Sequence, residues 1–371
     1  MRILHVISTL DVGGAEMHVL LQVRGQVARG HSVRVAYLLG EGALVADYKE
    51  AGAEWVGNVG SGPLAPWKLR THLGWCEAAH SHLLRADFVT AAAAFLFGKG
   101  KCLVSGKHND ERALLRPFVS RLHGLIGRIP ARTIVLSDHV GRFIAEYGRV
   151  PLTSQERVYY GIDPAPFAAA AADSKSRERL RAEFGFGLQD VVFLCVARFA
   201  PQKAHEVLIA ALAEARKQAP VRLLLVGGDP YGDGEQRARA VARELGVEQD
   251  RTCVFAGIRR DVPALLGAAD AFVMASRWEG LGLVFLEAMA AGLPVLSTNV
   301  SAIPEVVQDG ITGQLVPPDN APALTAAMLQ WAGDPDRRQA YGAAGMERVA
   351  AKFGLDRMVE QTLAIYADVA G

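Results

Sequence analysis

The chain has 371 residues, of which half are hydrophobic and about a fifth are charged. This length accommodates two α/β domains with cores of their own, and the composition is that of a globular protein. The formal net charge is +1, and no nucleic-acid partner is expected.

The small net charge hides an uneven distribution along the chain. Residues 1–163 carry 19 Lys and Arg against 14 Asp and Glu, so the N-terminal half is the basic one. The four cysteines, Cys76, Cys102, Cys195 and Cys253, are scattered without C-x-x-C spacing. Neither a zinc site nor a disulfide framework is predicted, and no cofactor is expected. Because no secretion signal or membrane span is recognisable, we expect a cytoplasmic protein.

The first 39 residues have the pattern of a parallel βαβ unit. Residues 3–7 predict a buried strand, Gly13 and Gly14 a tight turn, and residues 15–29 a helix before the next strand. The turn lacks G-x-G-x-x-G, and the second strand does not end on an acidic residue. A dehydrogenase is therefore disfavoured.

His108 follows a predicted strand end, where open α/β sheets place their ligands. An imidazole there can donate, accept or titrate near neutral pH, and a solvated loop histidine is the alternative. Just downstream, residues 114–129 place apolar side chains at helical spacing, with five arginines from Arg112 to Arg132 around them. Such a helix packs its apolar stripe on its own sheet, which we favour, or lies on anionic lipid as a peripheral membrane contact.

A second domain begins near Asp163, after which residues 191–196 predict a buried parallel strand. A helix from about residue 204 to 217 follows, with Pro201 at its start. Arg198 and Lys203 would then flank a helix N-terminus, where cationic side chains and free N–H groups converge on a diphosphate. The alternative is a pair of surface charges.

The stretch 275–292, ASRWEGLGLVFLEAMAAG, combines a glycine loop with a helix former after a short apolar strand. Glycines let the backbone approach a ligand, and a helix N-terminus favours an anion. Glu279 lies in the loop and Glu287 about one turn into the helix. Since a carboxylate accepts paired hydrogen bonds from vicinal hydroxyls, the two predict a nucleotide-sugar site. For either residue alone, a helix-dipole interaction is the alternative.

Glu279-x7-Glu287 within SRWEGLGLVFLEAMAAGLPVLST resembles the signature of retaining glycosyltransferase family 4, which has the GT-B fold. The resemblance implies that Glu279 lies near the donor sugar and that Glu287 holds the ribose. It also implies a catalytic His108 between donor sugar and acceptor. The other donor-binding positions it implies are Gly14, Arg198, Lys203, Gly282, Leu283 and Val284. The sequence departs from the family at Tyr160, where Asn is usual.

These observations lead us to expect two Rossmann-like parallel-sheet α/β domains facing across a cleft. Residues 1–163 would bind the acceptor, residues 164–352 the nucleotide sugar, and a helix in 353–371 would pack back on the first domain. The expected function is metal-independent, retaining transfer of a hexosyl-type sugar from a UDP or GDP donor to a glycan or lipid-linked acceptor. The alternatives are a GT-B epimerase or phosphorylase, or a non-catalytic sugar-nucleotide-binding protein.

Overall fold

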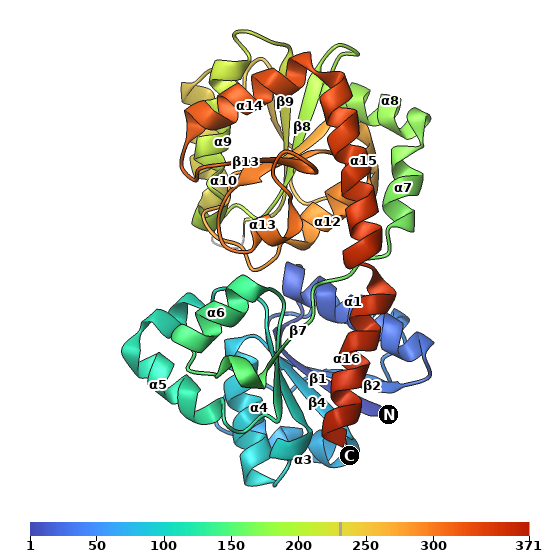
Figure 1. The fold of residues 1–371 in the computed structure, drawn as a ribbon, viewed down its shortest axis with the longest axis vertical. Helices are drawn as coiled ribbons and strands as arrows, with labels where there is room; N and C mark the ends of the chain where they lie inside the picture. Colours follow the sequence, from blue (N-terminus) through green and yellow to red (C-terminus); the bar gives the residue numbers. More distant parts are fainter. Residues whose placement is uncertain (230–231, 371) are drawn as a thin grey trace. The chain divides into compact units, whose positions relative to one another are not determined.

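The computed structural model describes residues 1–229 and 232–370, which leaves Gly371 of the expected last helix outside the described residues. The chain divides into two compact units, shown in Figure 1. The N-terminal unit comprises Met1–Ile162 and the C-terminal segment from Phe353, and the second unit comprises Asp163–Lys352.

The N-terminal unit contains a seven-stranded parallel sheet in the order β3-β2-β1-β4-β5-β6-β7. Its strands are β1 (Arg2–Thr9), β2 (Ser32–Leu39), β3 (Trp55–Asn58), β4 (Ala78–His82), β5 (Leu103–Lys107), β6 (Arg132–Val135) and β7 (Gln155–Arg157). Its helices are α1 (Gly14–Ala28), α2 (Val45–Glu50), α3 (Ala65–Trp75), α4 (Leu84–Leu96), α5 (Pro117–Ile126), α6 (Asp138–Glu146) and α16 (Leu355–Ala370).

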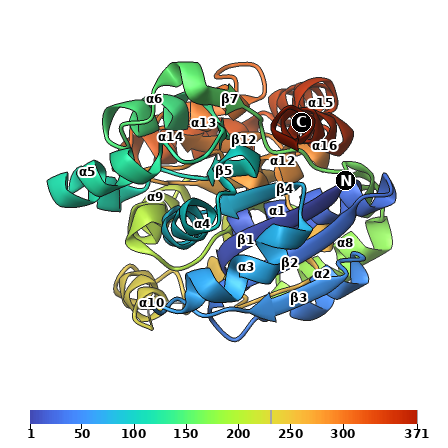
Figure 2. The same ribbon diagram turned by 90° about the horizontal axis from the view of Figure 1, so that it is seen from below.

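Both faces of this sheet are covered by helices, as Figures 1 and 2 show. Alternate residues of a strand point to opposite faces. Ile3 and Ile7 of β1 therefore pack with residues of α1 and α16, whereas Leu4 and Val6 pack with residues of α3 and α4. A strand buried on both sides explains the near-continuous apolar run at the start of the chain.

The second unit contains a six-stranded parallel sheet in the order β10-β9-β8-β11-β12-β13. Its strands are β8 (Val191–Val196), β9 (Val221–Val226), β10 (Cys253–Phe255), β11 (Ala271–Met274), β12 (Val295–Thr298) and β13 (Gly313–Val316). Its helices are α7 (Ala165–Ala171), α8 (Ser174–Phe184), α9 (His205–Ala215), α10 (Gly234–Glu244), α11 (Val262–Ala268), α12 (Leu283–Ala290), α13 (Ile303–Val306), α14 (Ala321–Gly333) and α15 (Pro335–Lys352).

Each sheet has one point where the strand order reverses, between β1 and β4 in one unit and between β8 and β11 in the other. Ligands of open α/β sheets bind outside the carboxyl ends of the strands at such a point. The prediction of two Rossmann-like parallel-sheet domains is confirmed.

The predicted helix after β8 is α9, which begins at His205, next to the expected start near residue 204, but Pro201 does not belong to it. Pro201 starts a short 3-10 turn, Pro201–Lys203, and not the helix itself. Ala204 then takes a left-handed conformation with φ of 48°, and α9 begins at His205. Lys203 therefore lies at the end of a turn that precedes the helix.

The basic amphipathic helix differs from the interpretation we favoured. Much of its apolar stripe faces solvent: the exposed fraction is 77% for Phe118, 64% for Leu125 and 40% for Leu122. The end of the stripe, at Ile126 and Ile129, packs against the core of the unit. The inward side of α5 is small and polar, and His123 on that side is buried. The His123 ring contacts Lys107 Nζ at 2.8 Å and the carbonyl of Gly148 at 2.6 Å. These polar contacts fix the rotation of the helix and turn its apolar side chains outward.

Candidate functional site

Lys203 and Glu279 meet at the carboxyl ends of β8 and β11, where the second sheet reverses its strand order. Lys203 follows β8 and Glu279 follows β11, and Lys203 Nζ is ion-paired with Glu279 Oε1. The Ser276 hydroxyl donates to the same carboxylate oxygen at 2.8 Å. Exposed fractions of 12% and 7% for the Lys203 and Glu279 side chains make this a largely buried pair.

The two loops that carry this pair are bound to each other. The side-chain amide of Gln202 donates to the carbonyl of Trp278 at 2.6 Å, and the N–H of Arg277 donates to the carbonyl of Gln202 at 2.8 Å. The Arg277 guanidinium also pairs with Glu206 at the start of α9, at 2.7 Å. Movement of either loop would therefore break several polar contacts.

The start of α12 provides the anion-binding geometry expected of the glycine loop. Gly282 precedes the helix with φ of 82°, and a Cβ there would lie 2.5 Å from the Phe285 ring, so only glycine fits. The first N–H groups of a helix, here those of Leu283 and Val284, have no intrahelical acceptor. Glu287 lies one turn further and is half-buried, and burial raises its pKa to about 7.

Arg198 lies directly after β8 with an exposed side chain, and it forms no ion pair with another described residue. Next to it, Gly227 at the end of β9 packs against the main chain. A Cβ on Gly227 would lie 2.0 Å from the carbonyl oxygen of Ala197. The two strand ends are thus in close contact, and the side chain of Arg198 beside them is exposed.

In the N-terminal unit, Gly13 and Gly14 form the turn between β1 and α1. A Cβ on Gly13 would lie 2.4 Å from Glu16 Oε2, whereas a Cβ on Gly14 would meet no described atom within 4 Å. Glu16 is held by the hydroxyl of Thr9, which donates to its Oε1 at 2.7 Å. Gly13 is therefore needed for packing, and the main chain at Gly14 remains open to a ligand.

His108 follows β5 as predicted, but it is buried and both of its ring nitrogens have partners. Nε2 lies 2.9 Å from His82 Nδ1, and Nδ1 lies 2.9 Å from the hydroxyl of Tyr160. Burial lowers the pKa of His108 to about 4, so the ring is neutral near pH 7. The carboxylate of the nearby Asp110 contacts His139 Nε2 at 3.0 Å.

A cavity of about 710 Å³ opens in the N-terminal unit beside Asn109 and Glu111. Its wall includes Phe88 of α4 and Val119 of α5. Burial raises the pKa of Glu111 to about 7, and the N–H of Leu84 donates to its Oε1 at 3.2 Å. The sequence did not single out Glu111, because nothing about an isolated Asp-Glu pair indicates burial.

Comparison with known proteins establishes the family. Residues 12–166 match the model of Glycosyltransferase Family 4, and residues 176–348 match the model of Glycosyl transferases group 1. The chain belongs to glycosyltransferase family 4. A GDP-mannose-dependent alpha-(1-6)-phosphatidylinositol monomannoside mannosyltransferase of Mycolicibacterium smegmatis is 36% identical over 258 residues, 63% of this chain and 66% of the relative.

A second relative, the alpha-maltose-1-phosphate synthase of the same organism, is 37% identical over 57% of this chain. The matched stretches span 66% of the first curated relative and 54% of the second, so the chain matches less than two thirds of either protein.

Among solved structures, Anabaena HepE in complex with UDP-glucose superposes with a TM-score of 0.90 over 99% of both chains, at 21% sequence identity. At this identity the match establishes the fold, and the predicted GT-B fold is confirmed.

Proposed function

We propose that this chain is a retaining glycosyltransferase. It transfers a hexosyl-type sugar from a UDP or GDP donor to a glycan or lipid-linked acceptor, in the synthesis of cell-surface polysaccharide or glycolipid. The observation that carries the proposal is the Lys203–Glu279 pair at the β8/β11 reversal, with the N-terminus of α12 in the same loop. A cation, a carboxylate and free N–H groups in one place match a diphosphate attached to a sugar.

In the proposed mechanism, Lys203 and Arg198 stabilise the negative charge of the leaving diphosphate, a role that a metal ion has in other enzymes. Glu279 hydrogen-bonds the donor sugar, and Glu287 accepts from the ribose hydroxyls. The acceptor oxygen attacks the anomeric carbon on the face from which the diphosphate departs, and a phosphate oxygen takes the acceptor proton. This front-face attack retains the configuration and requires no nucleophilic side chain.

We place the acceptor in the N-terminal unit, in the cavity beside Glu111. Its wall combines an aromatic ring, Phe88, with polar groups from Ser8, Asn109 and Glu111. Such a mixture suits a sugar or polyol, because rings stack on apolar faces while hydroxyls take hydrogen bonds. Gly14, with open space at its Cα, would let the main chain approach the donor or acceptor.

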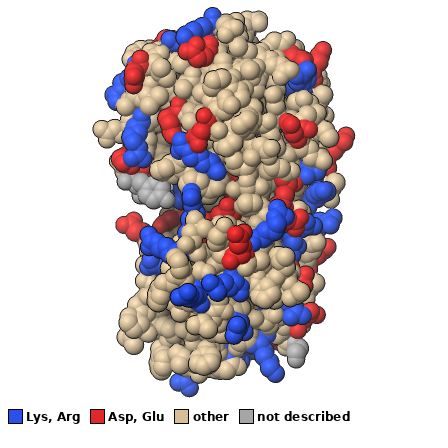
Figure 3. Space-filling model, turned by 60° about the vertical axis from the view of Figure 1, so that its left-hand side comes forward, with Lys and Arg blue, Asp and Glu red and all other residues tan. Residues whose placement is uncertain are grey.

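We further propose that α5 lies on an anionic membrane, on its cytoplasmic side. Phe118, Leu122 and Leu125 form an exposed apolar surface, with the exposed Arg116 and Arg121 beside it. Figure 3, which brings the α5 side forward, shows Lys and Arg side chains next to uncharged surface on the N-terminal unit. Apolar side chains flanked by cations match the interface of anionic lipids. No described helix has the length and apolar content needed to cross a membrane.

Contact with lipid would bring a lipid-linked acceptor close to the proposed acceptor cavity. Val119, on the same helix, forms part of the cavity wall. The phosphatidylinositol-linked substrate named for the mycobacterial relative is of this chemical class.

Binding of liposomes that contain anionic lipid tests this placement. Phe118→Ser/Leu125→Ser should co-sediment less than the unmodified protein at low salt, and binding should weaken as salt screens the arginines. Leu188→Ser is the matched control, since Leu188 is 90% exposed in the second unit. Equal binding by both variants would exclude α5 as the contact.

A panel of nucleoside diphosphates tests the donor site separately. A ligand at about 100 times its dissociation constant adds about 2.7 kcal/mol to the free energy of unfolding. One diphosphate should therefore raise the melting temperature clearly above the others, and the absence of any shift would contradict the donor assignment.

A further inference from the structure

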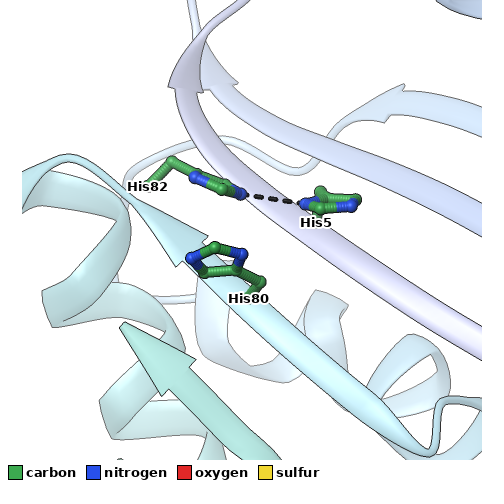
Figure 4. Close-up of side chains that lie close together, drawn as sticks. All are labelled: His5, His80 and His82. Carbon is green, nitrogen blue, oxygen red and sulfur yellow. Dashed lines mark hydrogen bonds between the residues drawn. The ribbon is translucent and has the colours of Figure 1, made fainter. Parts of the chain in front are cut away.

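Three histidines of the N-terminal unit converge on the sheet face that α1 and α16 cover. His5 comes from β1, and His80 and His82 come from the neighbouring β4. In the parallel register His5 is opposite His80, and Ile7 is opposite His82, so all three side chains point to the same face. The rings are 0–2% exposed. Figure 4 shows them turned toward one another, and one nitrogen of each lies within 4.8 Å of those of the other two.

Each ring is oriented from outside the cluster by a different element. His5 Nε2 lies 2.9 Å from Gln26 Oε1 of α1, and His80 Nδ1 lies 2.6 Å from the hydroxyl of Tyr366 of α16. His82 Nδ1 lies 2.9 Å from His108 Nε2. Histidines that bind metals are normally held in this way, with the second ring nitrogen on a carbonyl or another polar group.

One ring nitrogen of the cluster, His80 Nε2, lacks a hydrogen-bond partner among the described residues. A cavity of about 10 Å³, the size of one water molecule, lies beside His80 and Gly106. A Cβ at Gly106 would lie 2.6 Å from His80 Nε2, so glycine keeps this space open.

The hydrogen bonds fix the protonation of the rings in the metal-free protein. Gln26 Oε1 can only accept, so His5 carries its proton on Nε2 and accepts through Nδ1. His82 Nε2, 2.9 Å from His5 Nδ1, must then donate. It follows that His82 Nδ1 accepts from His108 Nε2, and His108 Nδ1 accepts from Tyr160. In this assignment His5, His82 and His108 each carry one proton and are neutral, and a histidine must be neutral to bind a metal.

We propose that His5, His80 and His82 form a binding site for a first-row transition-metal ion of the Zn²⁺ class. Imidazole nitrogens bind Zn²⁺ at about 2.0–2.1 Å, so two ligands of a tetrahedral site lie roughly 3.3 Å apart. The His5–His82 separation of 2.9 Å needs to open by a few tenths of an ångström, and the His80 nitrogen, within 4.8 Å of the other two, would move closer to them on binding. The water-sized cavity beside His80 has room for one water molecule next to that ligand. The site lies in the other unit from the proposed diphosphate site.

Binding of the ion has two consequences for the N-terminal unit. The ion would connect β1 with β4 directly, and α1 and α16 through Gln26 and Tyr366, so α16 would be held more firmly on the sheet. It would also reverse the hydrogen-bond chain. His82 must give its Nε2 lone pair to the metal, so its proton moves to Nδ1 and is donated to His108 Nε2. His108 then carries its proton on Nδ1, toward Tyr160.

The test uses the full chain, stripped with a chelator and titrated with Co²⁺ and Zn²⁺. We expect one equivalent of Co²⁺ with the visible absorption of a tetrahedral site, and its loss in His5→Asn, His80→Asn and His82→Asn. His31→Asn and His139→Asn are the matched controls, because both rings lie outside the cluster and are half-buried, and both should keep the ion. Gln26→Ala should weaken the affinity ten- to a hundredfold through the ring it orients.

Binding that is unchanged in the three cluster variants, or no tetrahedral Co²⁺ spectrum in the unmodified protein, would overturn the proposal. If the cluster variants do not fold, X-ray absorption of the unmodified protein loaded with Zn²⁺ decides the question. Three imidazole ligands support the site, and fewer than three refute it.

Discussion

Removing the ammonium group of Lys203 should destabilise the second unit by leaving a buried carboxylate without its cation. In Lys203→Met, Glu279 would keep the hydrogen bond from Ser276 and lose its ion pair. Breaking a buried pair from one side costs about 3–5 kcal/mol. Because the Ser276 hydroxyl still donates to the carboxylate, we expect a loss near the lower end, about 3 kcal/mol.

A double-mutant cycle separates this effect from lost packing. Lys203→Met/Glu279→Gln removes both charges and should cost less than the sum of the single variants, with a coupling energy of about 0.5–3 kcal/mol. Lys217→Met is the control, because the Lys217 side chain is 61% exposed and pairs with Glu214 on the surface. That change should cost less than about 1 kcal/mol.

Urea unfolding of the four proteins of the cycle and of Lys217→Met measures these energies, and calorimetry measures their ligand affinities. Lys203→Met should also lose more affinity for a nucleoside diphosphate than for the free nucleoside, since the phosphate contact is the one removed. A stability loss equal to that of Lys217→Met, with no coupling to Glu279, would refute the reasoning.

Four further predictions concern the proposed sites. Arg198→Ala should cost affinity for a nucleoside diphosphate without changing stability, because its side chain is exposed; equal losses for the free nucleoside would assign it a structural role. Glu287 has a pKa of about 7, so calorimetry should show nucleotide affinity rising with pH through 7, and this dependence should vanish in Glu287→Gln. Glu111 also has a raised pKa of about 7, so its contribution to stability falls as pH rises from about 4.5 to 7. Chemical unfolding at pH 5 and pH 8 should show Glu111→Gln gaining stability relative to the unmodified protein at the higher pH. His108→Ala should keep its nucleoside diphosphate affinity and lose about 2.7–4 kcal/mol of transition-state stabilisation. A normal transfer rate would show that His108 only forms its hydrogen bonds with His82 and Tyr160 and takes no part in transfer.

The sheets and the donor loop could be predicted from the sequence because their signals are local. Residues 191–196 form a near-continuous apolar run, which is typical of a strand buried on both faces. The glycines between Glu279 and Glu287 and the helix former after them lie within one stretch of the chain. The contact between Lys203 and Glu279 could not be predicted in this way. It depends on β8 and β11 being neighbours in the sheet, and no local sequence pattern specifies that.

The rotation of α5 shows why a periodic pattern was not enough. Helical spacing identified the apolar stripe correctly, but the sheet-facing side is determined by His123, whose partners Lys107 and Gly148 come from distant parts of the chain. The histidine cluster was missed for the same reason. His5 and His80 are adjacent only because β1 pairs with β4 in one particular register. The cysteine spacing, which argued against a zinc site, carried no information about these rings.

The central claim is that this chain transfers sugar from a nucleoside-diphosphate sugar to an acceptor. The most direct test incubates the protein with UDP and GDP sugars, with and without glycan and lipid-linked acceptors, and measures the released nucleoside diphosphate and the anomeric configuration of the product. The account predicts release from one donor only when an acceptor is present, with the configuration retained. Release without acceptor, conversion of the donor to an epimer, or binding without any turnover would contradict it.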